Sequence, residues 1–110
     1  MSIVKIELNQ KELEVLTQIL ESRIRDVENR LREIESRLRY FERKYGVSSS
    51  QLLEIIEGAE GRRAIWPLPN DADMDVVEWE GYAKLYNELK KEEKLLKYIA
   101  AKLKATQRNM

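Results

Sequence analysis

Residues 39–58 read RYFERKYGVSSSQLLEIIEG, and this stretch decides how the chain folds. A long, highly charged helical pattern reaches Gly46, and a short apolar segment begins after three serines. Gly46 directly follows Tyr45, and glycine often ends a helix in the left-handed conformation. Ser48 with Gln51 three residues later has the pattern of a capping box, which begins a helix. The stretch therefore predicts a corner between two helices.

Residues 10–45 predict one long amphipathic helix before this corner. Its apolar residues recur at steps of three and four, which is heptad spacing with one extra four-residue step near Leu20. They are Leu13, Leu16, Leu20, Ile24, Val27, Leu31, Ile34, Leu38, Phe41 and Tyr45. Asn9 and Glu12 form a capping-box pattern at its start. So long a stripe needs a second helix of similar length to cover it.

Residues 75–105 predict that second helix. Its first half is apolar over a wide arc, which indicates two neighbours, and the apolar face narrows beyond Leu89. Asp75 and Glu78 repeat the capping-box spacing, and Met74 is placed to pack on Trp79 as a hydrophobic staple. Gly81 lies in the middle of the helix, where glycine costs about 1 kcal/mol relative to alanine. We expect another helix to approach closely there.

The remaining segments complete an all-α fold in a single helical domain of residues 1–110. We expect a short helix at 49–57 across the end of the two long helices, as a lid. Residues 58–74 contain both prolines and are expected to form the long loop. Residues 2–8 alternate apolar and polar side chains and are expected to form an extended arm. The architecture is then a coiled-coil-like, long antiparallel helical hairpin.

Composition excludes several classes of function. The chain has no histidine and no cysteine, and so lacks the commonest general base, thiolate nucleophiles and the usual zinc ligands. We expect no enzyme activity, no catalytic residues, no cofactor and no metal. The run DADMD resembles the start of an EF-hand, but Val76 replaces the required glycine and Tyr82 the final glutamate.

No apolar run is long enough to span a membrane, so a cytoplasmic protein is expected. Charged residues make up 36% of the chain, a thermophile-like composition.

Charge and apolar surface favour association with another protein chain. Residues 51–83 have a net charge of −6 and residues 84–110 a net charge of +5. Complementary charge of this kind could orient two chains or a partner. One hairpin leaves an apolar strip uncovered, so we expect a homodimer, as a four-helix bundle. Its seam is expected to comprise Leu20, Ile24, Val27, Leu31, Ile34 and Leu38.

Two groups of aromatic and apolar residues are candidates for partner binding. The run RRAIWPLPN places Trp66 and Leu68 in a proline-stiffened loop beside two arginines. These side chains either plug the core or anchor a partner, because tryptophan and arginine are enriched among binding hot spots. The second group is the face formed by Trp79, Tyr82 and Tyr86.

The run YFERKYGVSSSQLLEIIEGAEG, followed by DMDVVEWEGYAKLYNEL, resembles a group of small helical proteins in archaea and cyanobacteria. Most members of this group have no known function. The shared pattern is a Phe-Glu-x-Lys-Tyr-Gly turn, a short Ser-led helix, and an Asp-rich stretch before Glu-Trp and a long helix. Matching positions are Phe41, Glu42, Lys44, Tyr45, Gly46, Ser49, Gly58, Asp73, Glu78 and Trp79. The resemblance implies an antitoxin-like protein encoded beside a small toxin.

These observations predict a non-catalytic protein–protein interaction module that works as a homodimer and masks the surface of a partner such as a small toxin. One alternative is a DNA-binding regulator that uses the N-terminal arm and the arginine-rich first helix. The zero net charge of the chain makes nucleic acid the less favoured partner. The other alternative is a purely structural coiled-coil protein.

Overall fold

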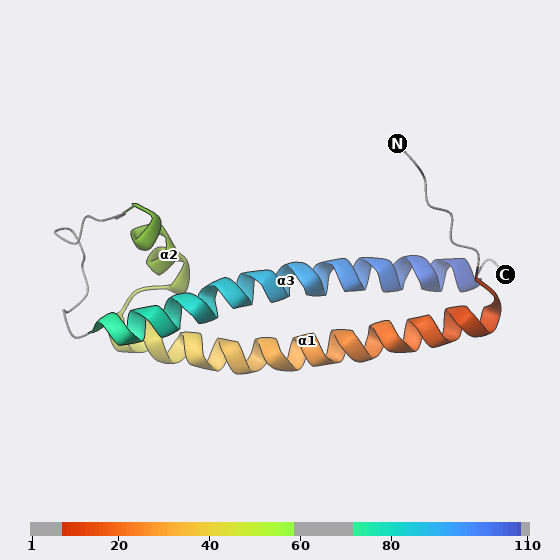
Figure 1. Cartoon of the computed structure of the whole chain (residues 1–110), viewed down its shortest axis with the longest axis horizontal. Coiled ribbons are helices and arrows are strands. Elements are labelled where there is room, and N and C mark those ends of the chain that lie inside the picture. The colour runs from red at the N-terminus through yellow and green to blue at the C-terminus, as the bar shows by residue number, and fades with distance from the viewer. Residues whose placement is uncertain (1–7, 59–71, 109–110) are drawn as a thin grey trace. The chain divides into compact units, whose positions relative to one another are not determined.

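The computed structural model describes residues 8–58 and 72–108, and all of its regular structure there is helical (Figure 1). The three helices are α1 (Gln10–Tyr45), α2 (Ser49–Gly58) and α3 (Asp73–Arg108). The predicted all-α class is confirmed, and α1 has the predicted bounds. The expected arm and most of the expected loop lie outside the described residues.

The two predicted capping boxes at α1 and α2 are confirmed. The backbone N–H of Glu12 donates to Oδ1 of Asn9 at 2.8 Å, and the N–H of Asn9 donates to Oε1 of Glu12 at 3.1 Å. Gln51 and Ser48 exchange the same pair of bonds at 3.1 and 2.9 Å. Each box satisfies backbone N–H groups that have no partner within the helix.

The end of α1 is also as predicted. Gly46 has a φ of 69°, the left-handed region that glycine enters without steric cost. Its N–H donates to the carbonyl oxygen of Glu42 at 2.8 Å, which extends the hydrogen bonding of α1 by one residue. The chain can therefore turn within three residues and begin α2 at Ser49.

The predicted start of α3 is wrong. The helix begins at Asp73, so Asp75 lies in its first turn instead of capping it. The side chain of Asp75 accepts hydrogen bonds from Lys44 and Tyr45, partners in α1 that no local sequence pattern reveals. Met74 is exposed, whereas Trp79 is fully buried, so the expected staple between them is absent.

The chain divides into two compact units, and both long helices contribute to each. Unit 1 combines the start of α1, to Glu28, with the end of α3, from Lys91. Unit 2 comprises Asn29–Lys90, and so includes the end of α1, all of α2 and the start of α3. Within each unit the segments of α1 and α3 run antiparallel, as predicted.

The two units have cores of very different size. Four described side chains are buried in unit 1: Leu13, Thr17, Val27 and Ala100. Ten are buried in unit 2: Leu31, Ile34, Leu38, Phe41, Leu52, Ala72, Val76, Trp79, Ala83 and Leu89. Two helices alone can bury only one narrow stripe, whereas unit 2 adds α2 as a third element.

The position of α2 corrects one expectation. This helix lies along the side of unit 2 and does not close its end, because Ser49 and Leu53 line the same recess as Ala83 and Tyr86. Leu52 is fully buried and anchors α2 in the core. The expected close approach at Gly81 is likewise absent within the described chain, since a Cβ atom added there would meet nothing within 4 Å.

Candidate functional site

One side of unit 1 carries apolar side chains from both helices. Steps of three and four residues from Leu16 lead along α1 to Ile19, Leu20 and Arg23, and all four positions share one side of the helix. The same steps from Glu92 lead along α3 to Leu95, Leu96, Ile99 and Leu103. Arg23 donates two hydrogen bonds to Glu92, at 2.7 and 2.9 Å, which places both stripes on the same side of unit 1.

The side chains of this face are only partly covered. Ile19 and Leu95 are each 59% exposed, and Ile99 is 36% exposed. Leu16, Leu20, Leu96 and Leu103 are half-buried. A groove of about 460 Å³ over the first turns of α1 extends the face, and Leu8, Val15 and Ile19 are among its lining residues. We call the set Leu16, Ile19, Leu20, Leu95, Leu96, Ile99 and Leu103 the apolar face.

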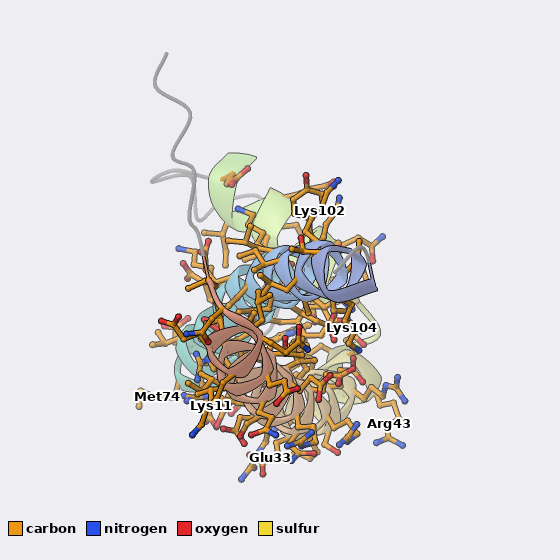
Figure 2. The ribbon with its side chains drawn as sticks, turned by 90° about the vertical axis from the view of Figure 1, so that its right-hand side faces the viewer. Lys11, Glu33, Arg43, Met74, Lys102 and Lys104 are labelled. Atoms are coloured by element: carbon orange, nitrogen blue, oxygen red, sulfur yellow. The ribbon has the colours of Figure 1, made fainter. Side chains whose placement is uncertain are left out.

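The opposite side of unit 1 is charged. Lys104 pairs with Glu21 at 3.1 Å, and Lys97 pairs with Glu28 at 3.3 Å. Figure 2 shows Lys104 projecting from one side of unit 1, whereas Lys102 projects from the outer surface of α3. Ion pairs this exposed contribute about 0–1 kcal/mol each. The hairpin of unit 1 is thus amphipathic as a whole, with one apolar and one ionic side.

In unit 2, Trp79 joins all three helices. Its ring stacks on Phe41 and on Tyr45, each at a centroid distance of 5.8 Å. Its Nε1–H donates to Oγ of Ser49 at 2.9 Å, and the backbone N–H of Ser49 donates to Oε2 of Glu42 at 2.7 Å. A buried indole that has both packing and a hydrogen-bond partner is a structural anchor.

An ionic cluster joins α1 to α3 beside this anchor. Oδ2 of Asp75 accepts from Nζ of Lys44 at 2.7 Å and from the hydroxyl of Tyr45 at 2.5 Å. These two hydrogen bonds, first that of Lys44, lower the pKa of Asp75 below its ordinary value. The bond to Asp75 raises the pKa of Lys44 and of Tyr45.

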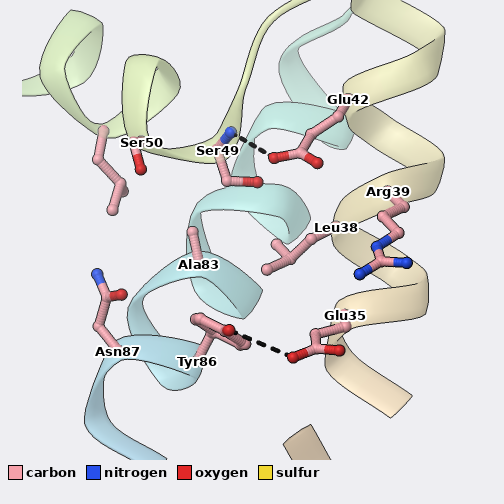
Figure 3. Close-up of a pocket in the computed structure, with 10 residues that line it drawn as sticks. Glu35, Leu38, Arg39, Glu42, Ser49, Ser50, Ala83, Tyr86 and Asn87 are labelled. Carbon is pink, nitrogen blue, oxygen red and sulfur yellow. Dashed lines mark hydrogen bonds between the residues drawn. The ribbon is translucent and has the colours of Figure 1, made fainter. Parts of the chain in front are cut away.

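A recess of about 240 Å³ opens between the three helices of unit 2 (Figure 3). Glu35, Arg39 and Glu42 of α1 line it together with Tyr86 and Asn87 of α3. The hydroxyl of Tyr86 donates to Oε1 of Glu35 at 3.3 Å, as Figure 3 shows. Its polar groups can offer hydrogen bonds to a ligand, but no nucleophile is paired with a base there. The recess therefore carries no chemistry that we can assign.

The residues predicted to bind a partner lie in different environments. Trp66 and Leu68 lie outside the described residues. Trp79 is fully buried in the core of unit 2, and its ring offers no surface to a second protein. Tyr82 and Tyr86 are half-buried. Trp79 therefore belongs to the core of unit 2. For Trp66, Leu68, Tyr82 and Tyr86, partner binding stays a prediction.

The predicted dimer seam is largely occupied within one chain. Val27, Leu31, Ile34 and Leu38 are buried, whereas Leu20 and Ile24 are half-buried. Sequence reasoning missed Ile19, the exposed side chain of α1 on the apolar face, because it lies beside the heptad positions. Two spacings in the sequence indicate this face: Ile19 lies three residues after Leu16 in α1, and Ile99 lies four residues after Leu95 in α3.

Comparison with protein-family models, with curated proteins and with solved structures finds no match to this chain. Along their described lengths, none of the helices is long and apolar enough to cross a membrane. Within residues 8–58 and 72–108, acidic side chains form no group of three or more that could hold a metal ion.

Proposed function

We propose that the chain is a non-catalytic protein–protein interaction module and that the apolar face of unit 1 is its binding surface. The observation that carries the proposal is the exposure of Ile19, Leu95 and Ile99 on one side of unit 1. Contiguous apolar surface on a small protein commonly marks an interaction site, whereas scattered exposed residues do not. Here the exposed residues follow helical stripes on both α1 and α3.

The shape of the face favours a helical protein segment as its ligand. The face is open and elongated, so it does not enclose a small molecule as a ligand pocket does. Helical partners pack side chains at steps of three and four into matching surfaces, which is the spacing of this face. The small core of unit 1 adds a reason for binding, because covering the face would bury apolar surface that two helices leave exposed.

The antitoxin-like role rests on the resemblance described above. On that reading the face would cover the surface of a small toxin and act by masking it, without chemistry. The DNA-binding alternative depends on an arm that lies almost wholly outside the described residues. No geometry within the described chain favours that alternative over protein binding.

Affinity purification from the native host tests the proposal. The tagged wild type, Ile19→Asp and Val77→Asp are compared, and co-eluting proteins are identified by mass spectrometry. Val77 is the matched control, because it is 68% exposed but belongs to unit 2. We expect a protein, either another polypeptide or an untagged copy of the chain, to elute with the wild type and with Val77→Asp, and to be lost from Ile19→Asp.

The opposite result is equally clear. Equal recovery of the same proteins by Ile19→Asp and the wild type would show that the apolar face is not the binding surface. Circular dichroism of the three proteins checks that helix content is unchanged before the recoveries are compared.

A further inference from the structure

We propose that the apolar face is covered by the same face of a second copy of this chain, in a four-helix bundle with two-fold symmetry. This inference rests on the proposed function, because it names the occupant of the same surface. Such a contact is isologous, so each residue pair across it occurs twice. The arrangement follows from the charges on the two helices of unit 1.

The two helical segments of unit 1 carry opposite net charge. Residues 10–28 of α1 contain five acidic and three basic side chains, whereas residues 91–106 of α3 contain five basic and two acidic ones. From residue 94 to residue 106, α3 has no acidic side chain at all. An acidic helix and a basic helix attract one another, and like charges in apposition are destabilising.

Two stacking arrangements bring the apolar faces of two copies together. A two-fold axis perpendicular to the helices would place α1 on α1 and α3 on α3, acidic against acidic and basic against basic. An axis parallel to the helices places α1 of each copy on α3 of the other. Because a helix of net negative charge then lies on a helix of net positive charge twice, the structure assigns the parallel axis, with both hairpins pointing the same way.

This arrangement identifies a specific pair of charges at the rim. Asp26 lies seven residues after Ile19, and Lys102 lies seven residues after Leu95, so each lies at the outer edge of the face. The ion pairs Glu21–Lys104, Glu28–Lys97 and Arg23–Glu92 show that these stretches of α1 and α3 lie level within a copy. A parallel axis keeps these levels, and Asp26 then lies along the same outer edge of the contact as Lys102 of the second copy.

Molar mass by light scattering, measured from nanomolar to high micromolar concentration, is the first test. We expect a dimer for the wild type and for the unit 2 control Val77→Asp, and a monomer for Ile19→Asp and Leu95→Asp. Both side chains are more than half exposed, so the substitutions leave the core untouched. Ile19→Gln, without a charge, provides a second variant with a dissociation constant at least tenfold above that of the wild type.

Charge exchange tests the orientation. Asp26→Lys and Lys102→Asp each place like charges in apposition twice per dimer, and we expect each to raise the dissociation constant several-fold. The double variant restores two attractive pairs and is expected to return the dissociation constant to near the wild-type value. If the two substitutions weakened the dimer additively, so that the double variant had a higher dissociation constant than either single variant, the parallel axis would be wrong.

The two proposals can fail separately. A wild type that stays monomeric at all concentrations would overturn the second copy as occupant. If a host protein nevertheless co-eluted with the wild type and not with Ile19→Asp, the apolar face would still be the binding surface, with another protein as its partner. A wild-type dimer that Ile19→Asp and Leu95→Asp leave intact would overturn this inference, because the dimer would then form elsewhere.

Discussion

The hydroxyl of Tyr45, the last residue of α1, donates a 2.5 Å hydrogen bond to Oδ2 of Asp75 in the first turn of α3. Nζ of Lys44 donates to the same oxygen at 2.7 Å. A carboxylate in the first turn of a helix also interacts favourably with the helix dipole. Asp75 therefore stabilises α3 locally and joins it to α1, and unit 2 should depend on its charge.

The pH dependence of stability is the first prediction. The folded pKa of Asp75 is lowered, so its stabilisation is present above about pH 3.8 and is lost as pH falls through the folded pKa. The pKa values of Tyr45 and Lys44 are raised, so their stabilisation is present below about pH 10 and is lost as pH rises through the folded values.

Asp75→Asn should therefore lower the urea midpoint at pH 7. The urea midpoint of this variant should also change less with pH than that of the wild type, at both the acidic and the alkaline end of the range. Urea titrations followed by circular dichroism from pH 2 to pH 11 measure this. Glu54→Gln is the control, because it removes an exposed carboxylate from the same unit. A pH profile of Asp75→Asn parallel to that of the wild type would contradict the role of this cluster.

Two glycines give opposite predictions for the same substitution. Gly46→Ala forces alanine into a φ of 69°, and we expect a loss of about 1–2 kcal/mol in unfolding free energy. Gly81→Ala lies within α3, where an added Cβ meets nothing within 4 Å, and should gain about 0.5–1 kcal/mol. Chemical denaturation of both variants tests the pair. A loss of stability in Gly81→Ala would indicate a close approach at that site that the described chain does not show.

The three helices, and the first residues of α1 and α2, could be predicted because these features depend on neighbours in sequence. Asn9, Ser48 and Gly46 act through bonds to residues three or four positions away, and local spacing contains that information. Asp75 has the same spacing from Glu78, but its partners are 30 and 31 residues distant. A competing tertiary contact of this kind leaves no mark in the local pattern.

The binding face could be predicted only in part, for a related reason. Heptad spacing identifies the side of α1 that is buried, but it does not say which chain buries it. Leu31, Ile34 and Leu38 are covered within unit 2, so the stripe expected between two chains is largely core. The exposed surface lies one step to the side, at Ile19, where the apolar arc is wider than a two-helix contact can cover.

The capping box of α2 provides a third prediction. Ser48→Ala removes the acceptor for the N–H of Gln51 and should cost about 1 kcal/mol of stability. Ser50→Ala changes the same kind of side chain at an exposed position inside the helix, where alanine is the better helix former. Equilibrium urea denaturation should therefore show a loss for Ser48→Ala and none for Ser50→Ala. Equal effects would mean that the capping bond does not stabilise α2.

The fourth prediction concerns Trp79, whose indole is fully buried and contacts Phe41, Tyr45 and Ser49. Trp79→Ala removes the ring stacking and leaves a cavity between three helices, which should cost about 3–5 kcal/mol. Met74→Ala, at an 80% exposed position in the first turn of α3, should change stability by about 0.5 kcal/mol or less. Circular dichroism during urea denaturation compares the two variants.

The same tryptophan can report on unit 2 directly. Trp66→Phe leaves Trp79 as the single tryptophan of the chain. Because burial among aromatic rings shields the indole from water, its fluorescence should shift to longer wavelength when unit 2 unfolds. We expect that shift to coincide with the loss of helix in unit 2. An indole already solvated before unfolding, or a Trp79→Ala variant as stable as Met74→Ala, would show that Trp79 is not the anchor that holds α2 against α1 and α3.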